Sequence, residues 1–167
     1  MQPIDTSKDT AIFSPCEKYR YILTRRFDPD NDKVCNFIML NPSTATAEKN
    51  DPTVARCCKY AQQWGYGALI VTNIFAYRST SRKKMKLFVR PTGPENEEYI
   101  EAAALKSNLI VCAWGTDGAF MNRGPIVHSE ITMFEETHCL EVTKHGHPKH
   151  PLYCKGDLKP IPYVGIN

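Results

Sequence analysis

The hydrophobic and polar positions along the chain follow two patterns in turn, one typical of strands and one typical of helices. Mostly apolar runs, typical of strands covered on both faces, occupy residues 34–40 (VCNFIML), 68–75 (ALIVTNIF) and 109–113 (LIVCA). An alternating segment at 19–27 (YRYILTRRF) predicts a half-exposed strand, and a short last strand is predicted around 139–142. Apolar residues recur at helical spacing between these runs, which predicts helices over 52–64, 95–107 and 124–136.

Strands that alternate with helices predict an α/β protein with three layers and a mainly parallel central sheet. The first helix has clear end signals, because Asp51 can cap its start, Pro52 suits its first turn, and Gly65 and Gly67 can end it. No repeat or change of composition marks a boundary. We therefore expect residues 1–167 to form a single α/β domain, with 1–15 and 158–167 as arms on its surface.

The composition narrows the class of protein. Of the 167 residues, 42% are hydrophobic and 23% charged, which is typical of a globular domain. The net charge of +3 permits a nucleic-acid partner without requiring one. No apolar run approaches the roughly 18–20 residues of a membrane span, and the first ten residues lack a signal-peptide core. Seven cysteines, an odd number, suit reduced thiols, so we expect a cytoplasmic protein with no membrane partner.

Polar residues follow four of the predicted strands. Ligands of parallel sheets bind at the carboxyl ends of the strands, so we expect these segments to meet at one edge. The segments are Asn41-Pro42-Ser43-Thr44, Asn73 with Arg78-Ser79-Thr80, Trp114-Gly115-Thr116-Asp117, and 145–153. Each also has a structural explanation: a turn at Asn41, a hydrogen bond to a neighbouring loop for Asn73, and core packing for Trp114.

Histidines and cysteines suggest two further kinds of site. His145, His147 and His150 with Cys154 could ligate zinc, but prolines and a lysine interrupt the stretch and no Cys-x-x-Cys motif accompanies it. We therefore expect no metal and no other cofactor. A Cys-His nucleophilic site is also open. However, the candidate thiols of Cys35, Cys57, Cys58 and Cys112 fall on apolar faces, where cysteine is usually a small core residue.

The chain resembles a family of phages and bacteria called domain of unknown function 1643. The resemblance covers nearly the whole chain and is carried by YRYILTRRF, FIMLNPSTA, the Asp51-Pro52-Thr53 helix start, WGYGALIVTNIFAYRST, AWG and HPLY. This family implies no activity. The order of the strand-end motifs is also similar to that of the uracil-DNA glycosylase superfamily. There, one strand ends in an Asn-Pro loop, a later strand reads the base edge, and a closing loop begins with His-Pro or Asn-Pro.

The second resemblance implies a uracil-DNA-glycosylase-like fold and assigns roles to the strand-end residues. Asn41 would position the attacking water and His150 would stabilise the departing base anion, so these two are the candidate catalytic residues. Asn73 would read a pyrimidine edge, and Phe75 or Tyr77 would stack on the base. The other candidate base- or nucleotide-binding residues are Pro42, Ser43, Thr44, Arg78, Trp114, Gly115, Lys149 and Tyr153. The implied partner is a nucleic acid with its target base flipped out, or a small nucleotide.

The sequence departs from the glycosylases at two places. The first loop lacks their water-activating Asp, so we expect slow activity, and the closing loop reads HPLY rather than His-Pro-Ser. The basic run Arg82-Lys83-Lys84-Lys86 is expected to be a solvated loop. Three functions remain open. They are an N-glycosidic hydrolase acting on a uracil-like or modified base in DNA, a binder or hydrolase of a small nucleotide signal that would suit phage counter-defence, and a metal-dependent hydrolase using the histidines.

Overall fold

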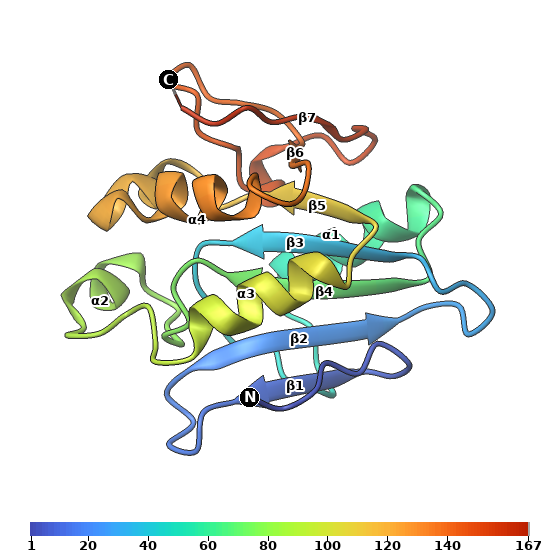
Figure 1. The fold of residues 1–167 in the computed structure, drawn as a ribbon, viewed down its shortest axis with the longest axis horizontal. Helices are drawn as coiled ribbons and strands as arrows, with labels where there is room; N and C mark the ends of the chain where they lie inside the picture. The colour runs from blue at the N-terminus through green and yellow to red at the C-terminus, as the bar shows by residue number, and fades with distance from the viewer. Residues whose placement is uncertain (167) are drawn as a thin grey trace.

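A mixed sheet of seven strands forms the centre of the protein, in a computed structural model that describes residues 1–166 (Figure 1). The strands are β1 (Thr10–Phe13), β2 (Arg20–Arg26), β3 (Val34–Met39), β4 (Ala68–Asn73), β5 (Leu109–Cys112), β6 (His138–Cys139) and β7 (Ile161–Pro162). The helices are α1 (Pro52–Gln63), α2 (Arg82–Leu87), α3 (Asn96–Leu105) and α4 (Arg123–Ile131), with 3₁₀ segments η1 (Thr116–Asn122) and η2 (Pro151–Tyr153). In space the strand order is β1-β2-β4-β3-β5-β6-β7.

The predicted α/β class is confirmed, and most predicted elements exist. Asp51 caps α1 as expected, since its Oδ1 accepts a hydrogen bond from the Val54 N–H at 2.8 Å. The last helix ends at Ile131 rather than 136. β6 lies earlier than predicted and is only two residues long, because the chain past Cys139 leaves the sheet and Val142 forms an isolated bridge with Pro148.

The sheet is less parallel than predicted. The inner strands β4, β3, β5 and β6 are parallel, while β1, β2 and β7 pair antiparallel with their neighbours. The reason lies in the connections. A helical crossover returns the chain for each parallel pair, whereas short turns join β1 to β2 and force an antiparallel pair. The segments predicted as surface arms supply the edge strands β1 and β7.

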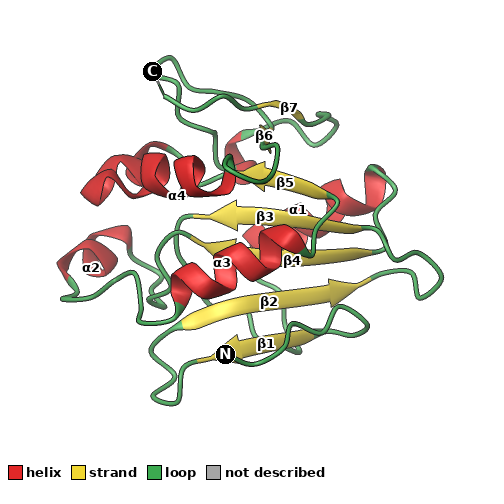
Figure 2. Cartoon of the chain, viewed as in Figure 1, coloured by secondary structure: helices red, strands yellow, loops and turns green. Residues whose placement is uncertain are grey.

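Helices cover both faces of the sheet, so adjacent residues of β3 enter different cores. Phe37 packs in the cluster that contains Tyr60 of α1. Ile38 packs in the cluster that contains Ile100 of α3 and Val127 of α4. In Figure 2, α3 crosses in front of the sheet and α1 lies behind it. This arrangement explains why β3 is apolar along its whole length.

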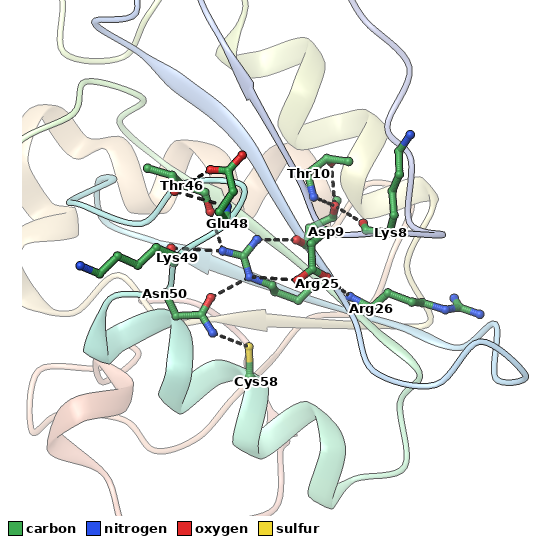
Figure 3. Close-up of polar contacts among 11 residues, drawn as sticks. Lys8, Asp9, Thr10, Arg25, Arg26, Thr46, Glu48, Lys49, Asn50 and Cys58 are labelled. Carbon is green, nitrogen blue, oxygen red and sulfur yellow. Dashed lines mark hydrogen bonds and ion pairs between the residues drawn. The ribbon is translucent and has the colours of Figure 1, made fainter.

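The prediction that β2 is half exposed is wrong, because six of its seven residues are buried: Tyr21 stacks on Tyr99 of α3, and the two arginines Arg20 and Arg25 contact the loop between β3 and α1. Its charged Arg25 is accommodated by local acceptors (Figure 3). Nε donates to Asn50 Oδ1 at 2.7 Å, Nη1 to the Thr24 carbonyl at 2.8 Å, and Nη2 to the Thr46 and Lys49 carbonyls at 2.5 and 3.3 Å. The Arg25 side chain therefore ties β2 to the loop that precedes α1.

The basic run expected to be a loop is the helix α2. Ser81 caps it by accepting a hydrogen bond from the Lys84 N–H at 3.2 Å, and Met85 is buried beneath it. A short amphipathic helix was missed because one buried side chain leaves almost no periodic signal. Within residues 1–166, no helix combines the length and apolar character needed to cross a membrane.

Candidate functional site

A cavity of about 320 Å³ opens at the edge of the sheet where β3, β4 and β5 end. All four strand-end segments singled out in the sequence contribute to its lining. The predicted residues that line it are Asn41, Ser43, Asn73, Trp114, Gly115, Lys149, His150 and Tyr153. Its volume lies at the lower end of the range for small-molecule sites, roughly 300–1,000 Å³, and suits one small ligand.

Asn41 follows β3 and is held in one orientation by the backbone around it. Its Nδ2 donates to the Pro42 carbonyl at 3.1 Å and to the Ser79 carbonyl at 2.9 Å, with the Tyr77 carbonyl at 3.5 Å. No hydrogen bond among the described residues uses its Oδ1. Because the amide nitrogen is engaged with backbone, Asn41 offers the cavity a fixed acceptor.

Asn73 is the last residue of β4 and is only 2% exposed. Its backbone carbonyl accepts a hydrogen bond from Asn96 Nδ2 at 2.8 Å. Its side-chain Oδ1 is buried and has no partner within residues 1–166. An unsatisfied buried acceptor costs about 1–3 kcal/mol, a cost that a hydrogen-bond donor on a ligand would remove.

His150 lines the cavity and also caps η2. Its Nδ1 accepts a hydrogen bond from the Leu152 N–H at 3.3 Å, which places the proton of the neutral ring on Nε2. Burial lowers the pKa of His150, nearby Arg82 lowers it further, and Asp51 opposes them. At neutral pH the ring is therefore an uncharged donor through Nε2.

This lowered pKa predicts a dependence of stability on pH. Below the unfolded value of about 6.5, the unfolded chain binds a proton at His150 that the folded chain does not bind. The free energy of unfolding should therefore fall as the pH drops from 6.5 toward the folded pKa, and be unaffected by His150 above 6.5. Urea unfolding between pH 5 and 8 would measure the difference between wild type and His150→Gln.

The matched control is His145→Gln, because that imidazole is exposed. We expect the His145→Gln variant to keep the acid loss of stability and the His150→Gln variant to lose part of it. Parallel curves for wild type and His150→Gln would contradict the inferred burial of a neutral ring.

Ion pairs hold the rim of the cavity. Asp117 of η1 receives Arg82 Nη1 at 2.8 Å and Lys86 Nζ at 2.5 Å, both from α2. Burial alone would raise the pKa of Asp117, but the hydrogen bonds from Lys86 and Arg82 bring it below its ordinary value. Lys149 pairs with Glu141 at 2.9 Å. The Asp117 ion pairs join α2 to η1, and the Lys149 pair holds the closing loop to the residues just after β6.

Five predicted residues do not line the cavity: Pro42, Thr44, Phe75, Tyr77 and Arg78. Phe75 is fully buried against Phe120, and Tyr77 stacks on Phe88. Arg78 lies over the Phe13 ring, Pro42 is buried, and Thr44 is exposed outside the cavity. These two aromatic residues fail as stacking partners because their side chains pack in the core, where Phe75 belongs to the cluster that contains Ile100 of α3. Trp114 and Tyr153 are the aromatic side chains that line the cavity.

The structure adds lining residues that the sequence did not indicate. They include Arg20, Thr53, Arg82 and Thr143, and Asp51, which was recognised only as a helix cap. Arg20 was missed for a topological reason. β2 runs antiparallel to β4, so its beginning lies at the edge where the parallel strands end. No pattern in the sequence separates Arg20 from the other arginines of that strand.

The histidine and cysteine sites are not assembled. The described part of the chain contains no group of three or more His, Cys, Asp or Glu side chains that could hold a metal ion. Cys35, Cys57, Cys58 and Cys112 are buried free thiols, and burial raises the pKa of each, so they are not thiolate nucleophiles at neutral pH. Neither kind of site is supported by this geometry.

One family model matches the chain. It is described as "Protein of unknown function (DUF1643)" and matches residues 20–152. No curated protein and no solved structure matches. The matched range begins at Arg20 and contains every lining residue of the cavity except Tyr153.

Proposed function

Because the chain belongs to the DUF1643 family, a family of unknown function, we propose its function from the cavity itself: it binds a nucleobase there and hydrolyses the N-glycosidic bond, as uracil-DNA glycosylases do. The observation that carries this proposal is the buried, unpartnered Oδ1 of Asn73 in a cavity that Asn41 and His150 also line. Such an acceptor at the end of a strand favours a ligand with an N–H donor, as a pyrimidine edge has.

The base would be read by Asn73 and activated by His150. The Asn73 amide presents an acceptor and a donor side by side, which complements the N3–H and O4 of uracil or thymine. The His150 Nε2–H would donate to O2 and stabilise the negative charge that develops on the departing base. A neutral donor that the fold holds in place requires little reorganisation in the transition state.

The water would be oriented by Asn41 Oδ1, which is the fixed acceptor of the cavity. Water adds to C1′ of the sugar, the bond to the base nitrogen breaks, and the base leaves with the electron pair and then takes a proton. The glycosylase carboxylate missing from the Asn41 loop has a substitute in Asp51, which lines the same cavity from the start of α1. Asp51 Oδ1 is engaged with the Val54 N–H, which leaves Oδ2 to receive a proton from water.

An abasic-site assay tests this function. Labelled oligonucleotides with uracil, mispaired thymine or modified pyrimidines, single- and double-stranded, are incubated with the protein and treated with alkali. We expect strand scission at one of these bases, and a rate lower by roughly tenfold to a hundredfold in Asn73→Ala, because the base edge loses its partner. Intact strands throughout, beside an active control glycosylase, would refute glycosidic cleavage of these bases.

The matched control for Asn73→Ala is Asn36→Ala. Asn36 is also a buried strand amide, but it lies outside the cavity and its Oδ1 accepts from Thr72 Oγ1. We expect Asn36→Ala to lower stability and to keep the cleavage rate of wild type at a temperature where both are folded. Equal losses of activity in the two variants would mean that Asn73 acts only through stability.

A second function, binding of a small free nucleotide, is favoured by the modest volume of the cavity. A ligand present at a hundred times its dissociation constant would stabilise the fold by about 2.7 kcal/mol. Thermal stabilisation by a mononucleotide, together with intact oligonucleotides, would favour this function over cleavage.

A further inference from the structure

Arg20 is a buried cation of the cavity whose charge is not compensated. It is 2% exposed, and within residues 1–166 the only hydrogen bond of its side chain runs from Nη1 to the Ala45 carbonyl at 2.9 Å. Its Nε is buried without a partner, and Nη2 makes no hydrogen bond in the described part of the chain. None of the ion pairs among those residues, counted to 4.0 Å, includes Arg20. A buried guanidinium in this state lacks the acceptors that normally offset its desolvation.

Arg25, on the same strand, gives the contrast. It is similarly buried, but Figure 3 shows its guanidinium surrounded by acceptors from the 46–50 loop and by Asp9, whose carboxylate lies at 4.0 Å. Every nitrogen of the Arg25 guanidinium donates a hydrogen bond. The fold therefore supplies hydrogen-bond acceptors to the guanidinium of Arg25, whose role is structural. It leaves donors of the Arg20 guanidinium without acceptors where that side chain reaches the cavity.

The start of α1 faces the same cavity and adds a second, independent feature. Asp51, Thr53 and Val54 line the cavity, and α1 is twelve residues long, so its first turn carries a partial positive charge. Asp51 satisfies the Val54 N–H, while the Thr53 N–H makes no hydrogen bond among residues 1–166. Helix starts with free N–H groups are common binding sites for phosphate.

The Asp51 carboxylate does not serve as the ion-pair partner of the Arg20 guanidinium. It forms no ion pair with Arg20 within 4.0 Å, and one of its oxygens is engaged by the helix. Burial lowers the pKa of Arg20 to about 10, and Asp51 opposes this shift, so the guanidinium stays charged at neutral pH. The other cations of the lining, Arg82 and Lys149, already have carboxylate partners.

We propose that Arg20 and the first turn of α1 form a phosphate subsite, so that the ligand of this cavity is a nucleotide unit rather than a free base or nucleoside. The identity of the base rests on the proposed function, whereas the phosphate subsite does not. Arg20 Nη2, the Thr53 N–H and the Thr53 hydroxyl are the donors available to phosphate oxygens. The phosphate comes from a mononucleotide or from the backbone of a nucleic acid.

Calorimetric titration of the full-length protein distinguishes these possibilities. The probes are deoxyuridine, its 5′- and 3′-monophosphates, inorganic phosphate and a short uracil-containing single strand, all at one ionic strength. We expect at least one monophosphate or the strand to bind about tenfold tighter than deoxyuridine, and inorganic phosphate to compete with it. A gain for a monophosphate identifies a free nucleotide, and a gain for the strand alone identifies a backbone phosphodiester.

Arg20→Met should reduce the gain in affinity over deoxyuridine to less than about threefold. Arg20→Lys should restore part of this gain. The control is Arg26→Met, since Arg26 lies at the other end of β2 and bonds to Pro29 and Asp32. If Arg20→Met does not fold, the wild-type comparison decides alone. Equal affinity for deoxyuridine, both monophosphates and the strand would overturn the subsite. Phosphate binding without strand scission would support the subsite and count against the glycosylase function.

Discussion

Replacing Asn41 by alanine is expected to lower the rate of glycosidic cleavage by roughly a hundredfold to a thousandfold, a loss typical for a group that positions the attacking molecule. Asn41 is an acceptor of the cavity whose orientation is set by backbone carbonyls, those of Pro42 and Ser79. Without the Asn41 side chain, no fixed acceptor orients the attacking water or keeps it near C1′. The rate of abasic-site formation at saturating substrate measures this loss.

The control for Asn41→Ala is Asn108→Ala. Asn108 also bonds through its side chain to backbone, since its Oδ1 accepts from the Val34 N–H at 2.8 Å. It precedes β5 and so lies at the opposite edge of the sheet. We expect both variants to lose stability, about 1 kcal/mol each, and only Asn41→Ala to lose cleavage. A wild-type rate in Asn41→Ala would exclude Asn41 as the residue that positions water.

Gly118→Ala is expected to destabilise the fold by about 3 kcal/mol, which lowers the melting temperature by roughly 6–12 °C. A Cβ atom at Gly118 would stand 2.1 Å from Cδ1 of Trp114, a side chain that is 2% exposed and lines the cavity. The indole has little room to move, because Gly124 packs against its Nε1 side. Thermal unfolding measures the effect, and weaker nucleotide binding should accompany it because the wall of the cavity shifts.

Gly156→Ala is the matched control for Gly118→Ala. The nearest atom to its added Cβ is the Arg56 guanidinium at 3.4 Å, the end of a flexible side chain. We expect its melting temperature to stay within about 2 °C of wild type. If Gly118→Ala also melted within that margin, the tight contact between η1 and Trp114 would be disproved.

Local sequence determined the elements that build the inner sheet. The apolar run at 34–40 is a strand covered on both faces because helices pack against each side, and Asp51-Pro52 begins α1 because its cap and first turn are local interactions. Parallel strands bring their carboxyl ends to one edge. It could therefore be predicted, before any distance was known, that one site contains Asn41, Asn73, Trp114 and His150.

Tertiary structure decided which side chains complete that site. Arg20 reaches it because β2 runs antiparallel to β4, and strand direction depends on pairing between distant segments rather than on the residues of β2. Phe75 is excluded because its side chain is buried in the core, where it packs against Phe120. Asp51 gains a place in the cavity because the start of α1 lies beside the loop that follows β3. Sequence periodicity records burial and local conformation, whereas contacts between segments far apart in the chain follow from packing alone.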